Sequence, residues 1–144
     1  TKGVNMKLNQ ELICTAIFLS VAISPLFAHG EHKPGPHGGE IRMPGAFHTE
    51  VSSYKDLGFK VYLLDINFEN PISKDSYVQG KVLSKGKEIA LKCSTHPDHF
   101  YCEFPKGISL NEGELILSPT RAGNKGAEAK YKLPLNESKE HNHG

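Results

Sequence analysis

Tryptophan is absent from this 144-residue chain, and aromatic residues make up only 8% of it. Carbohydrate platforms and aromatic cages are built from exposed aromatic rings, so the composition argues against both kinds of site. An excess of one charge is also lacking, because 17 basic and 16 acidic residues leave a formal net charge of +1. A balanced chain lacks the basic patch that binds nucleic acids or anionic lipids, so neither a nucleic acid nor a membrane is expected as a partner of the exported chain.

Sequence signs of a catalytic site are missing as well. No serine lies in a nucleophile elbow, and no pair of carboxylates has a context that indicates acid–base chemistry. Residues 123–126 (Gly-Asn-Lys-Gly) are typical of a turn, because no helix is predicted after them to complete a phosphate-binding loop. The sequence therefore predicts a protein that is not an enzyme.

Long hydrophobic runs are lacking, with one exception near the N-terminus. Residues 12–23 form an apolar run behind Lys7, with the proportions of a signal peptide and without the roughly 20 residues of a spanning helix. Ser24 and Pro25 end the run, and the small residue Ala28 predicts cleavage after it. Residues 1–28 are then upstream residues and a cleaved signal peptide, with a retained membrane anchor as the alternative. The expected location is the bacterial periplasm or outside the cell.

Cleavage would remove Lys2, Lys7 and Glu11, so the remaining chain would be formally neutral and long enough for one domain with a modest core. Glycine and proline are dense over residues 29–39, which predicts a flexible arm. The folded domain is expected over residues 40–135. The polar, histidine-containing residues 136–144 are expected to form a disordered tail.

The domain shows the two-residue periodicity of β-strands and no amphipathic stretch long enough for a helix. Residues 84–87 (Ser-Lys-Gly-Lys) predict a hairpin turn. Short strands separated by glycine or proline predict an all-β fold, a sandwich of two antiparallel sheets with seven to eight strands. The expected strands are residues 47–53, 57–68, 77–83, 88–93, 100–104, 114–117 and 127–133.

Histidine is the unusual feature of the composition. The chain has eight histidines, all after residue 28, and all except His48 gather in the arm, in one internal loop and at the C-terminus. Imidazole binds copper, zinc and nickel well, so the clustering indicates a transition metal, copper or zinc, as the ligand of an exported protein. The histidines are His29, His32, His37, His48, His96, His99, His141 and His143.

The first candidate metal site joins the arm to the first long strand. His48 and Glu50 are two residues apart and would project from the same face of a strand. His37 precedes Gly38 and Gly39, which allow a tight backbone turn. His37, His48 and Glu50 are therefore predicted as three ligands of copper or zinc, and the arm could add His29 or His32. The alternative is that His48 and Glu50 are ordinary solvent-facing residues.

Cleavage after Ala28 would also leave His29 with a free α-amine. The amine and the imidazole of one residue form a chelate for copper(II), and a copper enzyme built on this pair is a further possibility.

A second cluster has the spacing Cys93-x2-His96-x2-His99-x2-Cys102. Cys93 and Cys102 are the only cysteines after residue 28, and the favoured interpretation in an oxidising compartment is a disulfide across a hairpin. The alternatives are a zinc or copper(I) site with two thiolates and two imidazoles, and free buried cysteines. Under the disulfide interpretation His96 and His99 lie at an exposed tip and are weaker metal candidates. His141 and His143 could capture metal loosely or have no role.

Three strings of residues resemble a known family. They are Pro36-His37-Gly38-Gly39, His48-Thr49-Glu50-Val51 and Phe59-Lys60-Val61-Tyr62-Leu63-Leu64-Asp65. With Pro71 they resemble a small periplasmic domain of heavy-metal systems, which is similar to the N-terminal domain of periplasmic adaptor subunits of heavy-metal efflux pumps. The close match covers residues 36–71. The resemblance implies an immunoglobulin-like sandwich and a role in metal handling. This chain is too short to hold the other domains of an adaptor, and the cysteine loop departs from the pattern.

Together these observations predict an exported transition-metal-binding protein that serves metal efflux as a chaperone, buffer or accessory, with an efflux-pump component as a possible partner. Binding by neutral imidazoles should weaken as the pH falls through their usual pKa near roughly 6.5. The alternative is a structural or interaction module of the cell envelope with incidental histidines.

Overall fold

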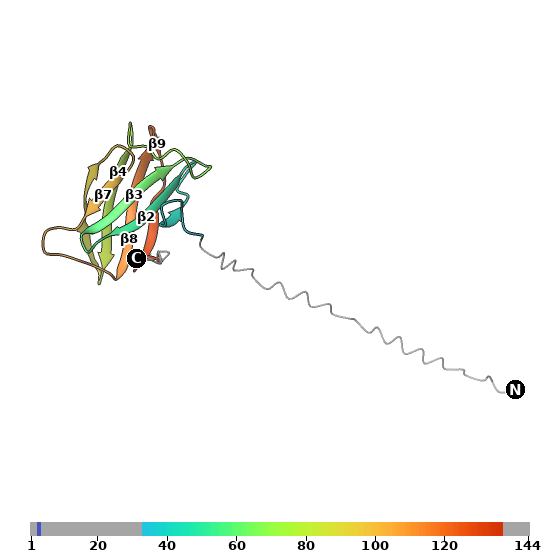
Figure 1. Cartoon of the computed structure of the whole chain (residues 1–144). Coiled ribbons are helices and arrows are strands. Elements are labelled where there is room, and N and C mark those ends of the chain that lie inside the picture. The colour runs from blue at the N-terminus through green and yellow to red at the C-terminus, as the bar shows by residue number, and fades with distance from the viewer. Residues whose placement is uncertain (1–2, 4–32, 137–144) are drawn as a thin grey trace, which may run out of the picture.

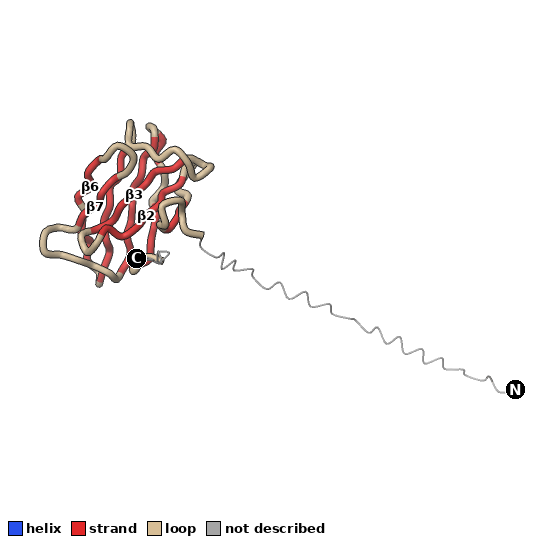
Figure 2. The backbone as a smooth tube through the Cα atoms, viewed as in Figure 1, coloured by secondary structure: helices blue, strands red, loops and turns tan. Residues whose placement is uncertain are grey.

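The computed structural model describes Gly3 and residues 33–136. These residues form ten antiparallel strands in two sheets that pack face to face, which confirms the predicted all-β sandwich (Figures 1 and 2). No helix within these residues is long and apolar enough to cross a membrane. The predicted signal peptide lies outside the described residues.

Sheet A carries the candidate site and has the order β1-β2-β3-β7-β6. Sheet B has the order β10-β8-β4-β5, and the short strand β9 pairs with β8. The strands of sheet A are β1 (Glu40–Arg42), β2 (His48–Tyr54), β3 (Gly58–Leu64), β7 (Phe100–Glu103) and β6 (Lys92–Thr95). Those of sheet B are β10 (Ala129–Leu133), β8 (Gly113–Arg121), β4 (Tyr77–Ser84), β5 (Lys87–Ala90) and β9 (Asn124–Lys125).

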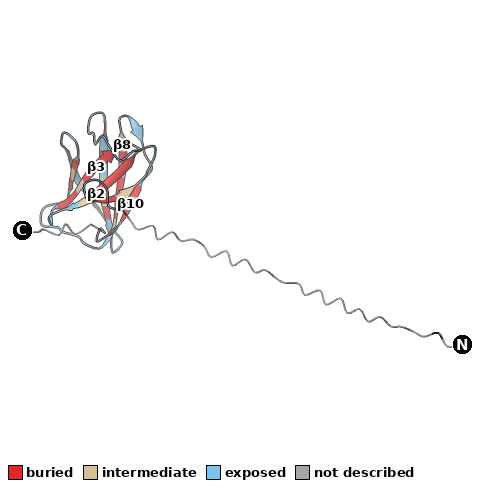
Figure 3. Ribbon diagram, turned by 45° about the vertical axis from the view of Figure 1, so that its right-hand side comes forward, coloured by how far each residue is buried: buried red, intermediate tan, exposed pale blue. Residues whose placement is uncertain are grey.

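The core lies between the sheets and follows the predicted alternation. Alternate residues of the central strands point inward and are almost fully buried (Figure 3). Burial of apolar side chains from both sheets is the main force that holds the layers together. The inward residues include Val51, Phe59, Val61, Leu63, Val82, Leu115, Leu117 and Tyr131.

The structure has ten strands where seven to eight were predicted, because the short strands β1 and β9 were not expected and one predicted strand is divided into β5 and β6. Three predicted strands also differ in extent. The strand predicted over residues 57–68 ends at Leu64, because the carboxylate of Asp65 accepts the backbone N–H groups of Asn67 and Glu69 and bends the chain into a loop. The strand predicted over residues 88–93 is interrupted at Leu91, where the chain leaves sheet B and enters sheet A.

Strand β8 is longer than predicted and contains Pro119, a residue that usually ends a strand. The carbonyl oxygen of Pro119 accepts a hydrogen bond from the N–H of Gly126. The backbone of Pro119 therefore faces away from β4, and its missing N–H removes no bond from the β4 ladder. The predicted hairpin turn is confirmed, with positive φ angles at Lys85 (51°) and Gly86 (75°) between β4 and β5.

Candidate functional site

His37 and Glu50 are brought together, although 13 positions separate them in the chain. The Nδ1 atom of His37 lies 2.8 Å from Oε2 of Glu50, and the backbone N–H of His37 donates to Oε1 at 2.7 Å. The N–H of Gly39 donates to the same oxygen at 3.0 Å. Glu50 is fully buried, so these three donors replace the water that its carboxylate loses on folding.

Residues 35–39, which the sequence assigned to a flexible arm, form a tight turn against this carboxylate. The N–H of Gly35 donates to the carbonyl of Gly39 at 2.7 Å, and the N–H of Gly38 donates to the carbonyl of Gly35 at 2.9 Å. Gly39 is needed for close approach, since a Cβ atom there would lie 2.7 Å from the carbonyl oxygen of Val51 and 2.8 Å from Cγ of Glu50.

The carboxylate of Glu50 determines which nitrogen of His37 is available. A carboxylate can only accept, so Nδ1 of the neutral ring carries the hydrogen and Nε2 carries the lone pair. Histidines that bind metals commonly have this arrangement, with a carboxylate holding the ring and its tautomer. The side chain of His37 is 34% exposed. Glu50, predicted as a ligand, is therefore placed to orient His37, and Nε2 of His37 is left to bind an ion.

His48, the third predicted ligand, is directed elsewhere. It projects from the same face of β2 as Glu50, but its ring is buried, stacks on Phe68 at 3.9 Å, and contacts the backbone oxygen of Asp65 through Nδ1 at 3.0 Å. No group of three or more histidine, cysteine, aspartate or glutamate side chains is arranged to hold a metal among the residues that the structure describes. Of the three predicted ligands, the structure joins only His37 and Glu50.

Tyr62 contacts both His37 and a histidine of the β6–β7 hairpin, His99. Tyr62 lies opposite Glu50 in the β2–β3 pairing. The ring of His37 stacks on Tyr62 with a centroid distance of 3.7 Å and an interplanar angle of 5°, and the ring of His99 lies 5.5 Å from the same tyrosine. Imidazoles from two distant segments thus meet around one tyrosine on the outer face of sheet A.

His96 and His99 occupy the tip of the β6–β7 hairpin, as predicted. Their rings stack on each other with a centroid distance of 4.9 Å, and both contact the ring of Tyr101 edge-on. The backbone N–H of His96 donates to the carbonyl of His99 at 2.9 Å. The tip therefore holds its two imidazoles in a defined arrangement.

Cys93 and Cys102 form the predicted disulfide, and they are directly opposite each other in the β6–β7 pairing. Cys102 is fully buried in the core and Cys93 packs against it. Tyr101, one position from Cys102, projects from the other face of the hairpin and contacts both histidine rings. Because the sulfurs and the imidazoles lie on opposite faces of the hairpin, the alternative site with two thiolates and two imidazoles is not assembled in the described residues.

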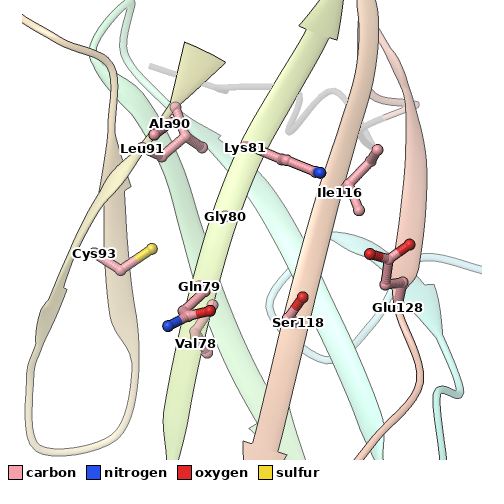
Figure 4. A pocket seen from close by; sticks show the side chains of 10 residues that line it. All are labelled: Val78, Gln79, Gly80, Lys81, Ala90, Leu91, Cys93, Ile116, Ser118 and Glu128. Carbon is pink, nitrogen blue, oxygen red and sulfur yellow. The ribbon is translucent and has the colours of Figure 1, made fainter. Parts of the chain in front are cut away.

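An open cavity of about 500 Å³ lies along β4, next to the point where the chain crosses between the sheets (Figure 4). No histidine lines it. Lys81 on its wall donates a hydrogen bond to Glu88 at 2.8 Å, and this bond raises the pKa of the lysine. The lining gives no pairing of nucleophile and base. The lining residues include Gln79, Gly80, Leu91, Cys93, Ile116, Ser118 and Glu128.

Four predicted metal ligands lie outside the described residues, namely His29 and His32 of the arm and His141 and His143 of the tail. Sequence reasoning also missed two residues that contact the histidines. Tyr62 stacks on His37, and the carboxylate of Asp98 lies beside Nδ1 of His99. The alternation of β3 could have placed Tyr62 on the outer face with Lys60. Its contact with His37 depends on strand pairing, which the alternation does not specify.

No protein-family model, curated protein or solved structure matches this chain. The resemblance of residues 36–71 to a heavy-metal-associated periplasmic domain stays a prediction.

Proposed function

We propose that this chain is an exported, non-enzymatic protein of the cell envelope that binds a transition-metal ion, copper or zinc, and serves its efflux or storage. The observation that carries the proposal is the imidazole of His37, which the buried carboxylate of Glu50 holds in the tautomer with a free Nε2 lone pair. An imidazole fixed in this way loses less conformational entropy on binding an ion than a mobile one does.

His37 supplies one ligand, and further donors have to come from its neighbours in the chain. His29 and His32 precede the turn by a few residues, and both were predicted ligands. With His37 they would offer an all-imidazole set, which suits copper(II) and zinc. His48 is left out of this proposed set, since its ring is buried between Phe68 and the backbone of Asp65.

The location in an oxidising compartment is supported by the Cys93–Cys102 disulfide, because such bonds persist outside the reducing cytoplasm. An accessory role beside an efflux pump fits a small protein of this kind and follows from the family resemblance. A structural envelope module with incidental histidines is the competing function, and it predicts no metal binding.

Calorimetric titration with copper(II) and zinc tests the proposal. The protein is purified from the cells that express it, and mass spectrometry identifies its N-terminal residue. We expect binding tighter than about 10 μM, and at least a tenfold loss of affinity in His37→Ala, since tenfold corresponds to about 1.4 kcal/mol.

His48→Gln is the matched control, since it also removes one imidazole, in this case from β2, and should leave the affinity unchanged. Equal losses in the two variants would restore the three-ligand site predicted from sequence. Wild-type protein that binds neither metal more tightly than millimolar would favour the structural module.

A further inference from the structure

The β6–β7 hairpin contains a buried imidazole nitrogen with no partner. Nε2 of His99 is enclosed by protein and, among the described residues, it is the one buried side-chain nitrogen or oxygen without a hydrogen-bond partner. A buried polar atom left in this way loses its bonds to water without gaining others, so native proteins rarely retain one without a use for it.

The other nitrogen of the ring is held by a neighbouring carboxylate. Nδ1 of His99 lies 2.5 Å from Oδ1 of Asp98. The carboxylate accepts the Nδ1 hydrogen, so the unpartnered Nε2 carries a lone pair rather than a hydrogen. His99 and Asp98 thus repeat the arrangement of His37 and Glu50.

A second imidazole, that of His96, stacks on the ring of His99. The ring of His96 is parallel to that of His99 within 5°, at a centroid distance of 4.9 Å. Among the described residues, its Nε2 has one polar side-chain contact, a long one of 3.4 Å to Oγ of Ser94, which is too weak to hold the ring. Two nitrogens that each bind an ion at about 2.0–2.1 Å stand roughly 3.3 Å apart in tetrahedral geometry. The lone pairs of stacked rings lie in parallel planes, so shared coordination of one ion requires the partly exposed His96 ring to rotate out of the stack.

We propose that His96 and His99 form a second site, at the tip of the β6–β7 hairpin, for a borderline divalent cation such as zinc or copper(II). Both imidazoles are ligands, and water completes the coordination. Asp98 is a positioning residue, because it holds His99 in the tautomer that leaves Nε2 free. The disulfide and the edge-on contacts with Tyr101 hold the hairpin in place.

This site is independent of the His37 site. The ring of Tyr62 contacts the ring of His37, at a centroid distance of 3.7 Å, and that of His99, at 5.5 Å. The site at the hairpin tip needs no residue of the arm. It therefore does not depend on where the signal peptide is cleaved.

The test is a zinc titration of the purified protein, followed by the ¹⁵N resonances of the histidine rings. We expect the Nε2 signals of His96 and His99 to shift together as zinc is added, and this shift to persist in His37→Ala, where one zinc equivalent should complete it. His96→Ala should abolish the shift of His99. Asp98→Asn should weaken the affinity of the hairpin tip for zinc at least tenfold. It should also populate the other His99 tautomer, a change that a purely structural role would not produce.

Ser94→Ala is the control for hairpin integrity, and it should bind as the wild type does. The site is refuted if the His99 ring signals stay unshifted at saturating zinc, or if they shift equally in His96→Ala. Since His96→Ala replaces a partly exposed ring, its folding can be confirmed from the backbone spectrum. Loss of binding in His37→Ala alone, with unshifted hairpin signals, would support the proposed function and reject this second site.

Discussion

At the scale of single residues, the decisive feature is a carboxylate that does not behave as its position in the sequence suggests. Glu50 lies two positions from His48 on one strand face, which is the usual spacing for paired ligands. In the fold its two oxygens accept from His37 and Gly39. A carboxylate with three donors is a poor metal ligand, but it is well placed to orient the imidazole beside it.

Glu50→Gln should therefore reduce metal affinity by about 10–100-fold without removing a ligand. The amide oxygen can still accept from the two backbone N–H groups. Its NH₂ group then faces Nδ1 of His37, which must become the acceptor, so the hydrogen moves to Nε2 and blocks coordination. The ¹⁵N chemical shifts of the His37 ring report the tautomer directly. An unchanged tautomer combined with unchanged affinity would remove Glu50 from the site.

At the scale of elements, the β6–β7 hairpin presents different kinds of residue on its two faces. The inward face contributes Phe100 and Cys102 to the core, and the outward face and tip carry Tyr101 and the two histidines. The disulfide joins directly opposite residues of the two strands. The disulfide therefore anchors a hairpin at the edge of sheet A, where β7 pairs with β3 and β6 is the last strand.

Replacing both cysteines by alanine should lower the free energy of unfolding by about 2–3 kcal/mol, the chain-entropy value for a loop of roughly ten residues. Urea denaturation monitored by circular dichroism measures the change, and the fold should persist because the core is otherwise intact. A comparison of the oxidised and the reduced wild type measures the contribution of the same disulfide to the free energy of unfolding a second time. A double variant as stable as the wild type would show that the hairpin needs no covalent link.

At the scale of the whole molecule, a buried tyrosine connects the two sheets. Tyr131 of β10 in sheet B is fully buried, and its hydroxyl donates to the carbonyl of Thr49 in sheet A at 3.1 Å. Burial raises the pKa of Tyr131 well above its usual value of 10.0. The guanidinium of Arg42 lies 4.7 Å from the centre of the ring and donates to the backbone of Lys130, which reinforces the same edge of the sandwich.

Tyr131→Phe should cost about 1–2 kcal/mol of unfolding free energy at neutral pH, the worth of a buried hydrogen bond. Since the pKa is higher in the folded than in the unfolded chain, the contribution of the hydroxyl is complete below pH 10 and declines as the pH rises above it. The stability difference between the wild type and the variant should therefore be constant from pH 8 to about pH 10 and narrow as the pH rises from 10 to 11 in urea denaturation. A difference that stays constant over this range would contradict the burial of the hydroxyl.

The elements of this fold that depend on near neighbours could be predicted from sequence. The alternation of apolar residues identified β2, β4, β7 and β10 to within two residues, because strand periodicity is a local property. The turn at Lys85 and Gly86 was equally local. Two cysteines follow residue 28, and their even number in an expected oxidising compartment was enough to favour the Cys93–Cys102 bond.

Boundaries set by side-chain hydrogen bonds or by the passage between sheets were missed. The end of β3 depends on the Asp65 carboxylate, and the interruption at Leu91 depends on which sheet each half of the segment joins. Neither appears in the hydrophobic pattern, since both sides of the boundary remain apolar.

By itself, the sequence determined the all-β class, the histidine clusters and the paired cysteines, because these follow from composition and from interactions a few residues long. Only the tertiary structure decided that Glu50 faces His37, that His48 turns to Phe68, and that His99 keeps a buried lone pair beside His96. Such contacts depend on strand register and on how loops fold over a sheet. Register is selected by burial across the whole domain, so no local stretch of residues contains it.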